Sequence, residues 1–83
     1  MKVFSDTAAE FVPAVARIFG KSPRVLDGSR ALLVDGVKLQ LEAGERELWL
    51  IERRGALEHR IGYVPVRGSI EEAVRLAKEQ IDG

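Results

Sequence analysis

Three short turn signals divide the middle of the chain into segments that can pair as antiparallel strands. They are Asp35-Gly36, the four residues from Glu42 to Glu45, and Arg54-Gly55. Asp-Gly between two apolar runs is a strong signal for a two-residue hairpin, and here it places Val34 opposite Val37. From Arg30 to about Val66 apolar residues recur at every second position, which is typical of strands with one buried face.

The other two turns predict the register of the remaining strand pairs. The four-residue loop places Leu39 opposite Leu48, and the Arg54-Gly55 turn places Leu50 opposite His59. Because side chains alternate along a strand, these registers gather the same set of apolar residues on one face. The predicted face comprises Leu32, Val34, Val37, Leu39, Leu41, Leu48, Leu50, Leu57, Ile61 and Tyr63.

An amphipathic helix is expected before the strands. Its apolar stripe consists of Phe4, Ala8, Phe11, Val15 and Ile18, with Val12 and Phe19 beside it. Gly20 would end this helix. Pro13 leaves two alternatives: a kinked helix that runs through the proline, or a regular helix that begins at Val12-Pro13. The unbroken stripe favours the kinked helix.

A second helix is expected at the C-terminal end of the chain. Ser69 and Glu72 form a capping box at its start. Ile70, Ala73, Val74, Ala77 and Ile81 then follow one another at helical spacing and form a single apolar stripe.

These elements predict one small α+β domain that covers residues 1–83. Two helices, each with one apolar stripe, can both cover the apolar face of the sheet. We therefore expect two layers, with a four-stranded antiparallel meander and the order α-β-β-β-β-α. A further short strand at residues 24–27 is left open.

Composition and charge restrict the class of protein. The 83 residues carry 13 basic and 13 acidic side chains, so the net charge gives no general attraction to nucleic acid or anionic membrane. The chain has no cysteine, no apolar run of the roughly 20 residues that span a bilayer, and no signal-peptide pattern. We expect a cytoplasmic protein. The absence of Asn and the many charged residues suit a thermophile, whereas a high-GC genome would equally well explain why nine Arg stand against four Lys.

The sequence offers little catalytic chemistry. His59 is the only histidine, and the predicted register packs it beside Leu50, where a structural role is favoured. A metal site would need carboxylates around that one imidazole. The glycines form no phosphate-binding motif. We therefore expect a non-catalytic domain with no cofactor, no metal and no small-molecule ligand.

The opposite face of the predicted sheet is a candidate contact surface. Apolar and charged residues are mixed on it: Leu33, Lys38, Trp49, Ile51, Arg53, Glu58 and Arg60, with Val64 as a further candidate. Tryptophan and arginine are enriched in interfaces, so we expect a homodimer or a complex with another protein. Alternatively, the terminal segment or the 21–29 connection covers Trp49 within one chain.

A nucleic-acid interface is the alternative function. Arg53, Arg54, Arg60 and Arg67 give the segment from Arg53 to Gly68 a local positive excess. Arginines beside a tryptophan on a sheet could contact phosphates and stack on bases of a single strand. Glu47 and Glu58 on the same predicted face disfavour this alternative.

Overall fold

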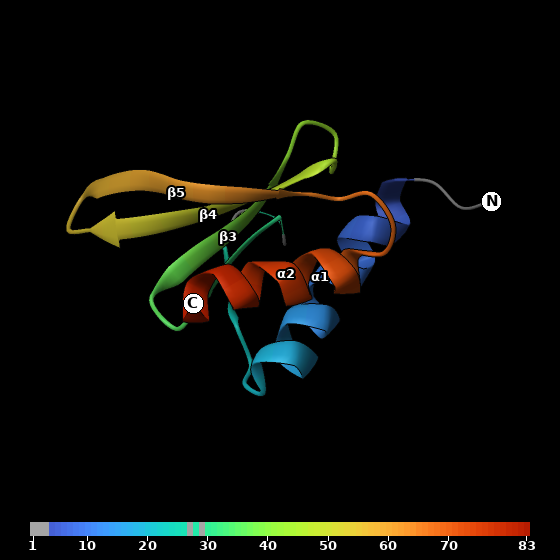
Figure 1. Cartoon of the computed structure of the whole chain (residues 1–83), viewed down its shortest axis with the longest axis horizontal. Coiled ribbons are helices and arrows are strands. Elements are labelled where there is room, and N and C mark those ends of the chain that lie inside the picture. The colour runs from blue at the N-terminus through green and yellow to red at the C-terminus, as the bar shows by residue number, and fades with distance from the viewer. Residues whose placement is uncertain (1–3, 27, 29) are drawn as a thin grey trace.

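The computed structural model describes residues 4–26, 28 and 30–83, and it describes side chains from Ala9 onward within those ranges. Figure 1 shows a curved antiparallel sheet with both helices on one side of it. The elements in chain order are α1 (Phe4–Phe19), β1 (Arg24–Leu26), β2 (Ala31–Val34), β3 (Val37–Glu42), β4 (Glu47–Arg54), β5 (Leu57–Pro65) and α2 (Ile70–Asp82).

The predicted fold class is confirmed: an antiparallel meander is flanked in sequence by two helices. In the described part of the chain the sheet has five strands in the order β1-β2-β3-β4-β5. The additional strand is β1, within the 24–27 segment that the sequence left open, where Arg24 pairs with Leu33 and Leu26 with Ala31.

Helix α1 runs through Pro13, which excludes a start at that residue. The apolar stripe is confirmed from Phe11 onward, because Phe11, Val15 and Phe19 are buried and Ile18 packs against them. The side chains of Phe4 and Ala8 lie outside the described residues. Gly20 follows the helix with a φ of 73°, and its N–H donates to the Ala16 carbonyl, as expected of a glycine that ends a helix.

Helix α2 has the predicted start and stripe. The Glu72 N–H donates to the Ser69 hydroxyl oxygen at 3.1 Å, which satisfies one of the free amides at the helix start. Residues Ile70, Ala73, Val74 and Ala77 are buried, and Ile81 packs at the edge of the same cluster. This stripe contacts α1 as well as β4 and β5.

The hydrophobic core lies between the helices and one face of the sheet, here called the inner face. The sheet residues of the core are Leu32, Val34, Leu39, Leu41, Leu48, Leu50 and Val64. Val37 is only partly buried. Most of the predicted apolar face is therefore confirmed, but β5 contributes differently from the prediction.

The first hairpin has the predicted register. Val34 pairs with Val37 and Leu32 with Leu39. Asp35 and Gly36 have φ values of 52° and 78°, which is the backbone of a type I′ turn. Aspartate tolerates this left-handed conformation, so the local sequence is sufficient to fix the turn.

The predicted register between β3 and β4 was wrong by two residues. Leu39 pairs with Leu50 rather than Leu48, and Glu42 pairs with Glu47. The four-residue loop is therefore 43–46 and not 42–45. A shift of two residues leaves every side chain on the same face, so alternation alone does not distinguish the two registers.

The predicted turn between β4 and β5 was also wrong. Arg54 pairs with Leu57, so the turn residues are Gly55 and Ala56. Gly55 has a φ of 63°, and glycine adopts this conformation without the strain that Arg54 would incur. His59 consequently lies opposite Glu52 rather than Leu50.

A β-bulge at Ile61 changes the faces of the rest of β5. Arg60 pairs with Ile51 and Gly62 with Leu50, so Ile61 is the additional residue. Beyond the bulge, Val64 enters the core, whereas the sequence placed it on the opposite face. Three residues predicted to be buried are instead exposed: Leu57 at 75%, Ile61 at 51% and Tyr63 at 49%.

These placements predict a large loss of stability for one leucine substitution and almost none for another. We expect Leu48→Ala to lower the free energy of unfolding by about 2–5 kcal/mol, because it leaves a cavity in the core. Leu57→Ala removes an exposed side chain and should change the free energy of unfolding by less than about 0.5 kcal/mol. Urea denaturation followed by circular dichroism measures both free energies. A comparable loss of stability in the two variants would contradict the burial of Leu48 and the exposure of Leu57.

Candidate functional site

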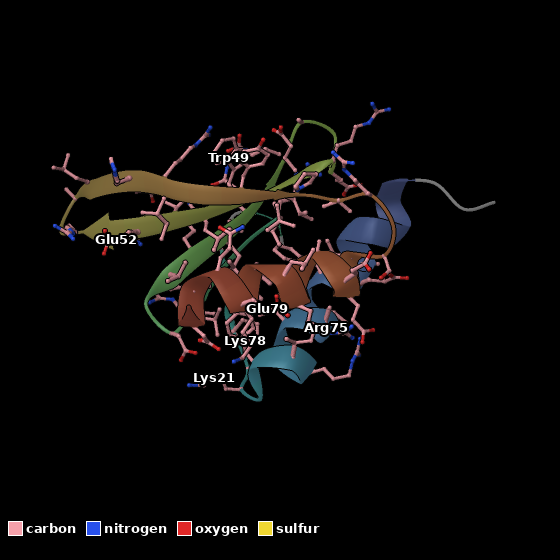
Figure 2. All side chains as sticks on the ribbon, viewed as in Figure 1. Lys21, Trp49, Glu52, Arg75, Lys78 and Glu79 are labelled. Carbon is pink, nitrogen blue, oxygen red and sulfur yellow. The ribbon has the colours of Figure 1, made fainter. Side chains whose placement is uncertain are left out.

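The outer face of the sheet is the side that points away from the helices. Figure 2 shows Trp49 on this side, with the labelled α2 residues on the other. The strand register assigns the following side chains to the outer face: Leu33, Lys38, Gln40, Glu42, Glu47, Trp49, Ile51, Arg53, Glu58, Arg60 and Tyr63. All seven residues predicted for the contact surface belong to this set.

Trp49 lies in an aromatic and cationic cluster. Its cross-strand partner is Tyr63, and the two ring centroids are 5.0 Å apart at an interplanar angle of 35°. The Arg60 guanidinium carbon lies 4.6 Å from the centroid of the Trp49 ring. The indole N–H donates to Glu47 Oε1 at 3.3 Å. The predicted pair of Leu50 with His59 would place the next residue along, Arg60, directly opposite Trp49. In the structure Arg60 is opposite Ile51 and reaches the ring diagonally.

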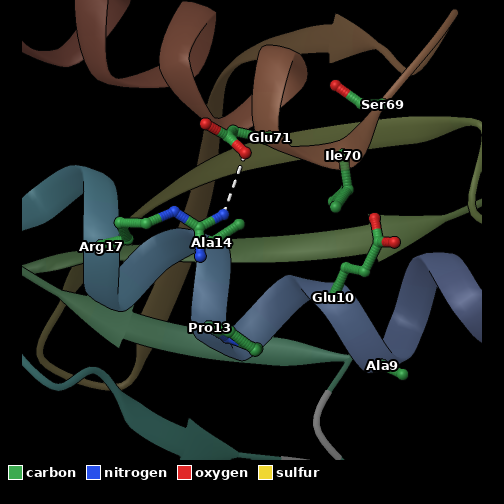
Figure 3. Close-up of a pocket in the computed structure, with 8 residues that line it drawn as sticks. All are labelled: Ala9, Glu10, Pro13, Ala14, Arg17, Ser69, Ile70 and Glu71. Carbon is green, nitrogen blue, oxygen red and sulfur yellow. Dashed lines mark hydrogen bonds and ion pairs between the residues drawn. The ribbon is translucent and has the colours of Figure 1, made fainter.

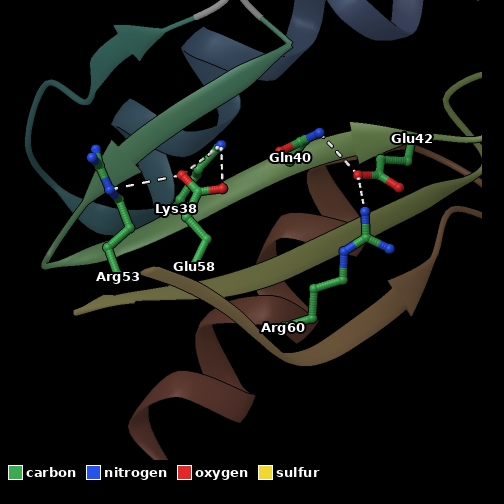
Figure 4. Close-up of polar contacts among 6 residues, drawn as sticks. All are labelled: Lys38, Gln40, Glu42, Arg53, Glu58 and Arg60. Carbon is green, nitrogen blue, oxygen red and sulfur yellow. Dashed lines mark hydrogen bonds and ion pairs between the residues drawn. The ribbon is translucent and has the colours of Figure 1, made fainter. Parts of the chain in front are cut away.

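Two groups of ion pairs flank this cluster (Figure 4). Around Glu58, Lys38 Nζ lies 3.1 Å and Arg53 Nε 3.7 Å from the carboxylate. Around Glu42, Arg60 Nη2 lies 2.6 Å from Oε2, which also accepts a hydrogen bond from the Gln40 amide at 2.9 Å. Pairs of this kind contribute only about 0–1 kcal/mol each to stability when exposed. The pair with Glu42 also positions the Arg60 guanidinium above the indole.

The predicted surface residues differ in exposure. Arg53, Glu58 and Arg60 are exposed, whereas Leu33, Lys38 and Trp49 are partly buried. Ile51 is only 3% exposed and contributes almost no accessible surface. The outer face therefore presents an aromatic pair between charged groups rather than an open apolar patch.

The sequence left open that a terminal segment of the same chain covers Trp49, but α2 does not cover it. Helix α2 packs on the inner face. In the 21–29 connection, β1 lies at the sheet edge beyond β2 and β3, and residues 27 and 29 lie outside the described residues.

Two residues of this surface were missed by the sequence analysis. Tyr63 was assigned to the inner face because the bulge was not foreseen. Glu42, the carboxylate partner of Arg60, was assigned to a loop. Gly62 was an available signal, because an isolated glycine within a strand often marks a bulge or a close approach of another group. A Cβ at Gly62 would lie 2.6 Å from Gln80 Oε1.

The arginines of the nucleic-acid alternative are not gathered on one surface. Arg53 and Arg60 lie on the outer face, each beside a carboxylate. Arg54 is on the inner side of the β4–β5 hairpin, 3.2 Å from Glu52, and Arg67 is in the connection to α2. Phosphate would have to compete with these carboxylates for the first three guanidinium groups.

His59 lies near the end of the β4–β5 hairpin. It is exposed, and with Glu52, Arg54 and Leu57 it lines a shallow pocket on the inner side, beyond the helices. The predicted packing of His59 beside Leu50 was therefore wrong. Its cross-strand neighbour is the Glu52 carboxylate.

A second depression lies between the two helices. Figure 3 shows it lined by Glu10 and Pro13 of α1 and by Ser69 and Ile70 at the start of α2. Across it, Arg17 Nη2 lies 2.9 Å from Glu71 Oε1, and Glu71 also pairs with Arg75. This arrangement connects the two helices by a surface ion pair.

Glu45 was not singled out by the sequence, yet it is a buried acid. Its φ is 71°, and Oε2 accepts a hydrogen bond from Arg30 at 3.2 Å. Oε1 is buried and has no hydrogen-bond partner among the described residues. A buried carboxylate is costly unless a cation compensates it, so the Arg30 contact supports the 43–46 loop.

Within residues 4–26, 28 and 30–83, no group of three His, Asp or Glu side chains is placed to hold a metal ion. In the same ranges, neither helix combines the length and apolar composition needed to cross a membrane. No protein-family model, curated protein or solved structure matches this chain.

The buried acid gives a prediction about stability. Arg30→Met leaves the Glu45 carboxylate without its cation, and we expect the free energy of unfolding to fall by about 1–3 kcal/mol. Arg54→Met is the matched control, because the pair of Arg54 with Glu52 is exposed and should contribute only about 0–1 kcal/mol. Urea denaturation measures the free energy of unfolding of both variants. Equal losses would show that Arg30 does not stabilise the buried Glu45 carboxylate.

Proposed function

We propose that this chain is a small non-catalytic domain that associates with protein through its outer face. The partner that we propose is a second copy of the same chain, so that the two form a homodimer. The observation that supports the proposal is the Trp49–Tyr63 pair beneath Arg60, on the side of the sheet opposite the helices. Aromatic residues and arginine are the side chains most often found at the energetic centre of protein interfaces.

The charges around this cluster suit a symmetric contact. In a twofold arrangement every contact occurs twice, so a cation of one copy can meet an acid of the other. Arg60 is exposed, and Glu47 and Glu58 lie on the same face, so both signs are present on one surface. Association would also bury surface of a domain that is small enough to be marginal on its own. A cytoplasmic location fits a chain without cysteine, because disulfides are rare in that compartment.

Replacing the indole tests the outer face. We expect the wild-type protein to sediment as a dimer at micromolar concentration, and we expect Trp49→Ala to weaken the dimer at least about 30-fold, which corresponds to roughly 2 kcal/mol. Leu76→Ala is the matched control, because Leu76 is an exposed residue of α2 in the helix layer. A monomeric wild type, or an unchanged dissociation constant in Trp49→Ala, would contradict the use of this face.

Nucleic-acid binding stays a prediction of the sequence alone. The competing carboxylates lead us to expect no binding of single- or double-stranded oligonucleotides in low salt, measured by fluorescence anisotropy. Binding that weakens steeply with added salt would instead support an interface built on the arginines.

A further inference from the structure

Among residues 4–26, 28 and 30–83, one edge of the sheet is open along β5. This strand is last in the sheet order, so within those ranges only one of its two edges pairs with another strand. It also carries three large apolar side chains that are exposed: Leu57, Ile61 and Tyr63. Unpaired edge groups of this kind can form hydrogen bonds with a strand of another chain.

The half of β5 that follows the bulge is protected against such pairing. The Gln80 side chain of α2 donates a hydrogen bond to the Tyr63 carbonyl at 3.3 Å. Gly62 leaves room for Gln80, the bulge at Ile61 interrupts the strand, and Pro65 has no amide hydrogen. The half from Leu57 to Arg60 belongs instead to a hairpin that projects past the helices and the neighbouring strands (Figure 1).

The hairpin geometry determines which backbone groups point to the open edge. A two-residue turn is closed by a hydrogen-bonded pair, here Arg54 and Leu57. Hydrogen-bonded and non-hydrogen-bonded pairs then alternate along the ladder. The N–H and C=O groups of Glu58 and Arg60 therefore point away from β4, toward the open edge.

We propose that this edge pairs, antiparallel, with the same edge of a second copy, with His59 on the twofold axis. Only outward-pointing residues can form the hydrogen-bonded pairs, so three registers are available before the bulge. Two of them place Glu58 opposite Glu58 or Arg60 opposite Arg60, and like charges directly opposite are destabilising. The third places Glu58 of each copy opposite Arg60 of the other.

This register has further favourable contacts. The two Glu58–Arg60 pairs form four backbone hydrogen bonds, two for each pair. The two sheets become one continuous sheet with both helix layers on the same side. Edge pairing goes beyond the proposed function, because it uses backbone groups of β5 and leaves the indole of Trp49 free on the outer face.

A cysteine at the twofold axis tests the pairing. The chain has no cysteine of its own, and the two copies of residue 59 form a non-hydrogen-bonded pair with Cα atoms about 4.5 Å apart. That spacing is within the range of a disulfide. We expect His59→Cys to form a covalent dimer under mild oxidation at micromolar concentration, seen on a non-reducing gel.

Leu57→Cys is the matched control, since it also places one exposed cysteine on the hairpin. In the proposed register the two copies of residue 57 are about 14 Å apart, too far for a disulfide. The variant should stay monomeric on the same gel. A His59→Cys protein that does not cross-link, or that cross-links no better than Leu57→Cys, would overturn the proposal.

Charge exchange provides a second test. Glu58→Arg and Arg60→Glu each place like charges opposite one another, so we expect each variant alone to associate at least tenfold more weakly than the wild type. In an equimolar mixture Arg faces Glu in both pairs, and sedimentation should show a heterodimer. A mixture that stays monomeric would contradict the register.

Trp49→Ala in the His59→Cys background separates the edge from the outer face. The indole does not touch the second copy across the edge, so cross-linking should persist in a double variant with a native circular dichroism spectrum. Loss of the cross-link would assign the association to the outer face and overturn edge pairing. Persistence together with an unchanged dissociation constant in Trp49→Ala would leave edge pairing standing and remove the outer-face dimer.

Discussion

The structure depends on the burial of one face of a twisted sheet under two helices. Leu39, Leu48 and Leu50 from the central strands meet Phe11 and Val15 of α1 in a single apolar cluster. A chain of this size has no second core that could compensate for a misplaced strand. Every other feature therefore follows from which side chains each strand presents to the helices.

The bulge at Ile61 determines which face of the sheet each later residue of β5 occupies. Because side chains alternate, a single additional residue exchanges the two faces for everything that follows. It places Val64 in the core and Tyr63 beside Trp49. The same irregularity, together with Gln80, covers the C-terminal half of β5 and leaves the hairpin half of its edge open. Core packing, the aromatic cluster and the open edge thus have a common origin.

The outer face combines aromatic surface with charges that already have partners. Arg60 lies over the indole and also contacts Glu42, so its position is fixed before any partner arrives. Preorganisation of this kind reduces the entropy that association would otherwise cost. The same ion pairs oppose phosphate binding, which is why protein association is the better-supported proposal. The open edge of β5 offers a separate contact made by the backbone, whose specificity comes from the alternation of Glu58 and Arg60.

The sequence by itself determined both helices, the Asp35-Gly36 hairpin and the two-layer arrangement. Each of these depends on local signals: Ser69 at a helix start, Gly20 after a helix end, and an aspartate and a glycine that accept positive φ. The same alternation placed all seven predicted contact residues on the outer face. Only the tertiary structure decided the β3–β4 register, the Gly55-Ala56 turn, the bulge and the burial of Glu45. A shift of two residues preserves alternation, and the segment 61–66 carries apolar residues at both parities, Ile61 and Tyr63 against Val64 and Val66. Packing against the core cluster, to which α2 contributes, selects Val64 and Val66 for the inner side, and this long-range packing cannot be read from the local sequence pattern.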